Sequence, residues 1–188
     1  MLKFTLVLIC CLTFILTSSL QAQTDPFAGG QAVDAAALSP SELPSFDEYR
    51  QAPENIKIST ISPKELSSAR SGREKVFVLD ARNKEEFDIS HISSAKRAGY
   101  DDFSVERIWM VDRKARVIVY SAAGERANTV AQYLKLMGFL DIQILEGSLI
   151  GWKNAGHEVV DNNNQKTERV HVGKKQNMKL LTSGKVVF

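Results

Sequence analysis

The sequence predicts an α/β domain with a central, mostly parallel sheet that is covered by helices on both faces. Continuous apolar runs at residues 76–79 and 117–120 have the composition of strands that are buried on both faces. Helical patterns separate these runs, and strands that alternate with helices are typical of parallel sheets. The length of 188 residues suits one ordinary domain with extensions and is too short for two full-sized domains.

Besides the apolar run at residues 76–79, the first half of the domain contains a short strand and three helical segments. Residues 58–61 alternate apolar and polar side chains, as a strand does. Residues 62–65 (Ser-Pro-Lys-Glu) form a capping-box pattern with proline at the first helical position, so we expect a helix that runs to about Arg70. Residues 84–87 favour a short helix, and the less regular pattern at residues 104–110 favours another.

The second half contains the most regular helical pattern of the chain. Its apolar positions recur at helical spacing and end before Gly138, a typical C-terminal stop. These positions are Ala127, Val130, Ala131, Leu134 and Met137. After the two apolar runs, a third strand of the central sheet is expected at residues 142–145, in addition to the short strand at residues 58–61. A last helix at residues 147–155 is stopped by Gly156.

The N-terminus has the organisation of a secretory signal peptide at residues 1–22. Lys3 gives a minimal positive region, residues 4–16 form an apolar run, and Ala22 is a small residue at the expected cleavage point. The run is shorter than the roughly 20 residues that span a bilayer, although a retained signal anchor is the alternative. We therefore expect export to the periplasm or the extracellular space, with no stable membrane span after cleavage.

Composition divides the rest of the chain into three parts. Residues 23–55 form a Pro/Ala-rich acidic linker, of which residues 44–49 are a candidate to dock on the domain. The domain itself is expected at residues 56–160. Residues 161–188 form a basic tail, for which we favour a solvated tail over a binding arm.

Charge and cysteine content exclude several classes of function. The net charge of +2 does not suit a chain that binds nucleic acid as a whole, because such binding needs a concentrated basic face. Cys10 and Cys11 are the two cysteines, and both lie in the apolar run of the signal. A mature chain that begins at Gln23 would have no disulfide, no cysteine-based metal site and no thiol nucleophile. We expect no cofactor and no metal.

The turn that follows residues 117–120 is the main candidate site. Ligands in parallel sheets bind beyond the carboxyl ends of the strands, and a helix N-terminus directs amides and positive dipole toward an anion. Gly124 permits an unusual backbone conformation, and Arg126 adds a positive charge that favours an anion. The Glu125 carboxylate offsets this charge. A turn without a ligand is the alternative. The predicted anion-binding loop comprises Ser121, Ala122, Ala123, Gly124, Glu125 and Arg126.

Four motifs in order resemble the rhodanese-like (single-domain sulfurtransferase) family over roughly residues 61–160. They are an opening strand and helix at residues 61–66, a first signature at 79–82 with 85–87 and 91–95, the strand and active-site loop at 117–126, and a closing signature at 145–152. The resemblance implies a rhodanese-like three-layer sandwich. It also implies that the loop at residues 121–126 corresponds to the family's active site.

The loop departs from the family pattern at its reactive position. Family loops read Cys-x-x-Gly-x-Arg followed by Ser or Thr, whereas this chain has Ser121, Gly124 and Arg126 followed by Ala127. Family enzymes carry sulfur as a cysteine persulfide formed by a thiolate, and a serine hydroxyl is a weak nucleophile unless a base activates it. A helix dipole contributes at most about 2 kcal/mol, roughly 1.5 pKa units, which does not produce an alkoxide. We therefore expect no sulfur transfer through this loop.

Two enzymatic alternatives remain beside an inactive binding module. One is a sulfurtransferase-related enzyme that tolerates serine, and the other is a hydrolase that uses Ser121. A hydrolase needs a base, and we expect His91 to be a packing residue, His157 to follow a helix end and His171 to lie in the tail. The favoured prediction is an exported, inactive rhodanese-like domain that binds a protein partner or a small anion.

Two charged residues follow the strand at residues 76–79. Asp80 and Arg82 could support the pocket, but we favour a structural salt link or a loop cap.

Overall fold

The computed structural model describes residues 43–53, 55–72 and 74–188. The predicted signal peptide and most of the predicted linker lie outside the described residues. Within the described ranges, no helix has both the length and the apolar character needed to cross a membrane.

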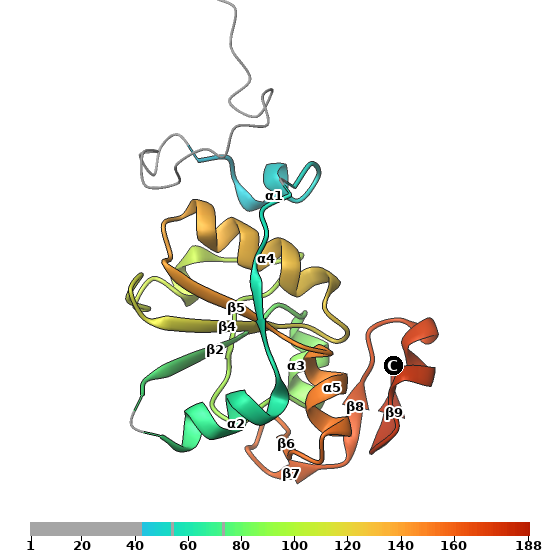
Figure 1. Ribbon diagram of the computed structural model, residues 1–188. Helices are drawn as coiled ribbons and strands as arrows, with labels where there is room; N and C mark the ends of the chain where they lie inside the picture. The colour runs from blue at the N-terminus through green and yellow to red at the C-terminus, as the bar shows by residue number, and fades with distance from the viewer. Residues whose placement is uncertain (1–42, 54, 73) are drawn as a thin grey trace, which may run out of the picture. The chain divides into compact units, whose positions relative to one another are not determined.

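The centre of the domain is a five-stranded parallel sheet, which confirms the predicted fold class (Figure 1). Its strands run in the spatial order β1-β5-β4-β2-β3. Their bounds are β1 (Ser59–Ile61), β2 (Val76–Asp80), β3 (Lys96–Arg97), β4 (Arg116–Tyr120) and β5 (Asp141–Leu145). The register pairs Leu79 with Val119 and Asp80 with Tyr120, so β2 and β4 end side by side at the carboxyl edge of the sheet.

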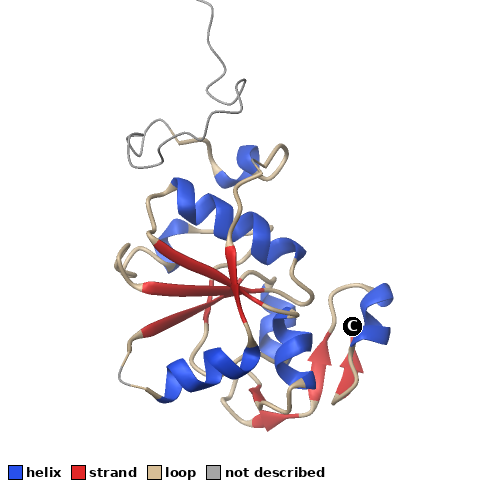
Figure 2. Ribbon diagram, viewed as in Figure 1, coloured by secondary structure: helices blue, strands red, loops and turns tan. Residues whose placement is uncertain are grey.

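Helices lie on both faces of this sheet and give the three layers (Figure 2). They are α1 (Phe46–Tyr49), α2 (Pro63–Ser71), α3 (Lys84–Ile89), α4 (Glu125–Leu136) and α5 (Ser148–Asn154). The capping box predicted for α2 is present: Ser62 Oγ accepts from the Glu65 amide at 3.2 Å, and the Glu65 carboxylate accepts from the Ser62 amide at 2.9 Å. Such reciprocal bonds satisfy amides that have no partner within the helix.

Two apolar clusters fill the space between the layers. Alternate residues of a strand point to opposite faces, so Leu79 packs in the cluster beneath α4 while Val78 packs in the cluster that contains Leu149 of α5. Val117 and Ile118 divide in the same way, and neither is exposed. Burial on both faces explains why β2 and β4 read as continuous apolar runs.

The expected helix at residues 104–110 is only a short 3₁₀ turn, η1 (Val105–Arg107). Trp109 and Met110, which follow it, are each 72% exposed. Ile108 and Val111 are the buried apolar residues of this stretch, and two such residues are fewer than the buried stripe that stabilises most short helices. The prediction of a full helix was wrong for this reason.

Residues 44–49 dock on the domain. Phe46 and Tyr49 of α1 are buried among aromatic rings, with the Phe46 ring 5.2 Å from the Tyr133 ring of α4. The Tyr133 hydroxyl also donates to the Pro44 carbonyl at 2.8 Å. The domain therefore uses a piece of the sequence that composition alone assigned to the linker.

The C-terminal residues are folded, and the expectation of a solvated tail was wrong. They form β6 (Val159–Val160), β7 (Lys166–Thr167), β8 (Arg169–His171), the 3₁₀ helix η2 (Lys175–Leu180) and β9 (Lys185–Val187). Val170 and Val172 are completely buried in the cluster of α5, and β8 contacts α3. The physical reason is the alternation in Arg-Val-His-Val, which gives this short stretch one apolar face.

Candidate functional site

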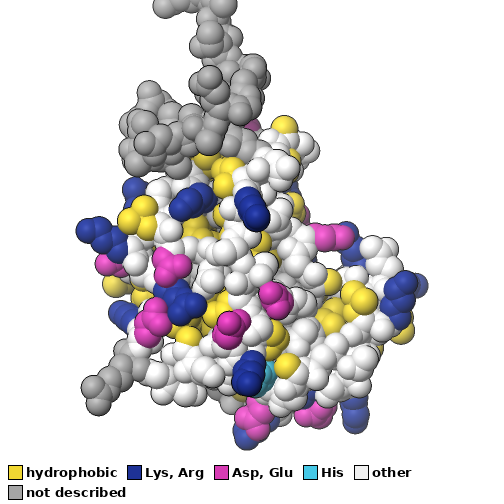
Figure 3. Space-filling model, viewed as in Figure 1, with side chains coloured by type: hydrophobic (Ala, Val, Ile, Leu, Met, Phe, Trp, Pro, Cys, Tyr) yellow, Lys and Arg dark blue, Asp and Glu magenta, His cyan; other side chains and the backbone are white. Residues whose placement is uncertain are grey.

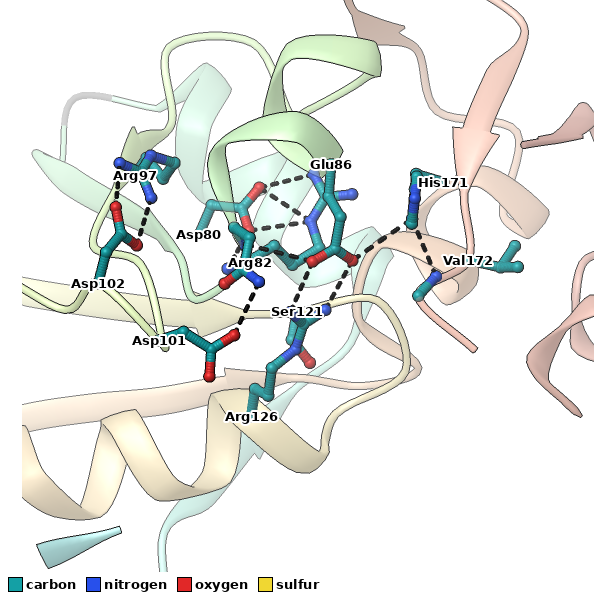
Figure 4. A network of polar contacts seen from close by, with 12 residues as sticks. Asp80, Arg82, Glu86, Arg97, Asp101, Asp102, Ser121, Arg126, His171 and Val172 are labelled. Atoms are coloured by element: carbon teal, nitrogen blue, oxygen red, sulfur yellow. Dashed lines mark hydrogen bonds and ion pairs between the residues drawn. The ribbon is translucent and has the colours of Figure 1, made fainter. Parts of the chain in front are cut away.

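The loop between β4 and α4 lies at the carboxyl edge of the central strand (Figure 4). Gly124 has a φ of +117°, a conformation that favours glycine, and it directly precedes α4. Ser121 is 2% exposed, and its hydroxyl oxygen accepts from the Gly124 amide at 3.0 Å. Of the amides from Ala122 to Arg126, only that of Gly124 has an acceptor among the described residues. The loop therefore leaves donors available at a helix N-terminus.

The start of α5 holds this loop in place. Ser148 Oγ accepts from the Ser121 amide at 3.1 Å, while the amides of Leu149 and Ile150 donate to the carbonyls of Ser121 and Ala122 at 3.1 and 3.2 Å. Gly147 and Ser148 adopt positive φ values of 65° and 54°, which turn the chain so that these amides face the loop. The sequence analysis identified the closing motif but missed the role of Ser148. Its position next to Gly147, at the start of a predicted helix, was the signal that could have indicated this role.

Arg126 is paired within the protein. Its guanidinium donates to both carboxylate oxygens of Glu86 on α3, at 2.6 and 2.7 Å. The Glu86 side chain is only 8% exposed. Burial alone would raise the pKa of Glu86, but hydrogen bonds from Arg126 and the charges of Arg126 and Arg82 lower it below its usual value. An anion in the loop must therefore compete with a buried carboxylate for Arg126.

The loop forms part of a cleft of about 570 Å³. Carboxylates outnumber cations in its lining: Glu85, Glu86, Asp101 and Glu125 stand against Arg126 and Lys174. This volume lies in the range of small-ligand sites, but the charge balance does not favour a free anion. The structure brings all the predicted loop residues together except Gly124, which sits behind the lining as the cap of α4.

Asp80 and Arg82 do not line this cleft. Both side chains are fully buried, with Arg82 Nη2 2.7 Å from Asp80 Oδ2 and 2.6 Å from the Ser90 carbonyl. Burial alone would lower the pKa of Arg82, but the Asp80 carboxylate raises it above its usual value. The pair joins the end of β2 to the end of α3, which is the structural role that the sequence analysis favoured.

Two of the three histidines have packing roles. The His91 ring stacks on Phe87 with centroids 3.8 Å apart, and its Nδ1 lies 2.9 Å from the Phe87 carbonyl. The His157 ring stacks on Trp152 at 4.1 Å. Neither ring lines the cleft.

His171 is the histidine that the folded C-terminal segment places in the cleft. Its Nδ1 accepts from the Gly173 amide at 3.1 Å and lies 3.5 Å from Glu86 Oε1. Burial lowers the pKa of His171 below its usual value. The positive charges of Arg82 and Arg126 also lower this pKa, whereas the negative charge of Glu86 raises it. No histidine of the described segments hydrogen-bonds to Ser121, so the hydroxyl has no paired base.

Together, the parallel sheet and the amide-lined turn before α4 define a three-layer α/β domain with a loop site beyond its central strand. The model of the rhodanese-like domain family matches residues 62–155, and the chain belongs to that family. Residues 156–188, which include His171, lie outside the match.

The chain also resembles solved structures and curated proteins over about half of its length. The chain resembles a thiosulfate sulfurtransferase from Pseudomonas aeruginosa, with 28% identity and a TM-score of 0.52 over 55% of this chain and 20% of that one. It resembles the Alr3790 protein from Anabaena sp. with 25% identity and a TM-score of 0.50, over 54% and 91% of the two chains. A tRNA uridine(34) hydroxylase from Streptococcus thermophilus is 33% identical over 95 residues, which are 48% of this chain and 29% of that relative. The chain thus spans less than a third of that curated relative.

Proposed function

We propose that this chain is an exported rhodanese-like domain that does not transfer sulfur and that acts as a binding or interaction module. The residue that carries the proposal is Ser121, which stands where the family loop that the sequence resembles has its cysteine. Its hydroxyl accepts a hydrogen bond from the Gly124 amide. Export rests on the apolar run and cleavage pattern of residues 1–22. N-terminal sequencing of the protein from the cell envelope or medium tests export, with Gln23 as the expected first residue.

The lack of a base supports the absence of sulfur transfer. A persulfide forms when a thiolate attacks a sulfur donor, and a serine would have to lose its proton without a base within hydrogen-bonding distance. A helix N-terminus stabilises an anion by at most about 2 kcal/mol, far less than a hydroxyl needs to ionise near neutral pH. The described ranges contain no cysteine that could replace Ser121.

The charges of the cleft argue against a free anion, so the ligand that we propose is a protein partner. Arg126 already binds Glu86 through two hydrogen bonds, and Lys174 pairs with Glu125.

A nucleic-acid partner is not proposed, although relatives are named as tRNA enzymes. On the face drawn in Figure 3, basic and acidic side chains are interspersed, whereas counterion release needs basic residues gathered together.

A cyanide–thiosulfate assay tests the catalytic part of the proposal. We expect no turnover from the wild type or from Ser121→Ala. Ser121→Cys should give slow turnover at high thiosulfate concentration, because the loop amides and their contacts with α5 are present while Glu86 still occupies Arg126. The alternative is a sulfurtransferase-related or Ser121-dependent enzyme. Wild-type turnover that is lost in Ser121→Ala would establish that alternative and refute the proposal.

Calorimetric titration with sulfate, thiosulfate and phosphate tests the anion part. The wild type should give no binding heat at millimolar ligand, because Glu86 occupies Arg126. Glu86→Gln removes the competing charge and should allow weak anion binding. Saturable heat from the wild type would instead restore the anion-binding loop as the function of residues 121–126.

A further inference from the structure

The C-terminal segment forms a second wall of the cleft, opposite the Ser121–Arg126 loop. Gly173 approaches the loop so closely that a Cβ there would lie 3.1 Å from the Ala122 Cβ and 3.5 Å from Arg126 Nη2. His171, Lys174 and Asn177 also line the cleft. We name residues 171–177 the C-terminal wall. It lies entirely beyond residue 155, where the family match ends.

The base and the tip of the C-terminal wall are attached with different strength. At the base, Val170 and Val172 are completely buried against the domain. At the tip, Lys174 Nζ pairs with Glu125 Oε2 at the start of α4, and the two side chains are 59% and 70% exposed. Exposed ion pairs hold their partners only weakly, whereas apolar burial resists opening. The tip is therefore the part of the wall that separates from the loop most easily.

We propose that the C-terminal wall controls access to Ser121 and that the Lys174–Glu125 pair is its latch. Ser121 is buried but lines the cleft, and Gly173 lies against Ala122 beside it, so a molecule that reaches Ser121 through the cleft passes along the C-terminal wall. Lys174 and Asn177 then contact that molecule and determine which ligands enter. This inference concerns access only and does not depend on the proposed absence of sulfur transfer.

A single thiol at the loop measures this access directly. The experiment uses the full chain with Ser121→Cys, Cys10→Ser and Cys11→Ser, so that one thiol is present. The rate of alkylation by iodoacetamide, an uncharged reagent, is measured across pH. The plateau of the pH profile gives the rate constant of the thiolate, and the midpoint gives the thiol pKa. Because the nucleophilicity of a thiolate rises with its pKa, each plateau is corrected for the measured pKa, and the corrected rate constant reports access.

The latch predicts a specific order of rate constants. Lys174→Gln should raise the plateau rate constant by up to about fivefold, the range that an exposed ion pair supports. The charge swap, Glu125→Lys with Lys174→Glu, should return it to the starting value because the pair is restored. Lys179→Gln is the matched control, since Lys179 is an exposed lysine of η2 outside the cleft lining, with no ion pair among the described residues.

Two results would overturn the proposal. The first is an equal plateau rate constant for Lys174→Gln and Lys179→Gln, which would mean that the pair does not restrict access. The second is a charge swap that stays as fast as Lys174→Gln, which would assign the effect to the lysine alone. Both results would have the same meaning whether or not Ser121→Cys transfers sulfur.

Discussion

Glu86→Gln is the most informative perturbation of the site, because Glu86 neutralises Arg126 from a nearly buried position. Removing one partner of a buried ion pair destabilises a protein by about 3–5 kcal/mol, since the other charge is left uncompensated. The Arg126 side chain is 21% exposed and can be partly hydrated, and glutamine keeps one acceptor oxygen. We therefore expect a loss of about 2 kcal/mol in the free energy of unfolding, or roughly 4–8 °C in Tm for a chain of this size.

Urea unfolding of the full chain at pH 7 measures this loss. Glu158→Gln is the matched control, because its partner Lys166 is 73% exposed and Glu158 is 65% exposed. That substitution should change the free energy of unfolding by less than about 1 kcal/mol. Indistinguishable values for the two variants would refute the view that Glu86 and Arg126 form a partly buried, stabilising pair.

The difference in the free energy of unfolding between the wild type and Glu86→Gln should also depend on pH, which gives a second test. The pKa of Glu86 is lowered in the folded protein, chiefly by Arg126 against the opposing effect of burial. A carboxylate whose pKa is lower in the folded than in the unfolded protein stabilises the fold at pH values above its unfolded pKa. This stabilisation is lost as the pH falls through its folded pKa. The gap between wild type and Glu86→Gln should therefore be full at pH 7 and should shrink below about pH 4.3. A gap that grows on acidification would contradict this assignment.

Three further predictions concern the loop and the C-terminal segment. Ser148→Ala removes the acceptor of the buried Ser121 amide and should lower the free energy of unfolding by about 1–3 kcal/mol in urea unfolding; no change would mean that α5 does not clamp the loop. Val170→Ala should cost about 1.5–3 kcal/mol by the same measurement, because Val170 is completely buried, and a change below about 0.5 kcal/mol would mean that the segment is not packed. The pKa of His171 is lowered by burial, so the free energy of unfolding should fall as the pH drops below about 6.5. His171→Gln should flatten this part of the plot of unfolding free energy against pH. An unchanged slope in the variant would mean that another group titrates there.

The strands and the main helix could be predicted because short-range patterns determine them. Residues 117–120 are apolar without interruption since β4 is covered on both faces, and the stripe from Ala127 to Met137 matches one face of α4. The partner of Arg126 could not be predicted in this way. Glu86 lies 40 residues away on a different helix, and nothing local in the sequence links the two. The fold of residues 169–172 was missed because a two-residue alternation is too short to stand out in a polar segment.

The preserved frame around Ser121 has a structural explanation that does not require catalysis. The carbonyls of Ser121 and Ala122 accept from the first amides of α5, so the loop also caps that helix. Gly124 is needed for its positive φ, and Arg126 is needed to balance the buried charge of Glu86. Any change in the loop path would leave these groups without partners, at a cost in folding free energy. None of these contacts involves the side-chain oxygen of Ser121, so a serine at this position, as the proposal has it, leaves the shape of the site intact.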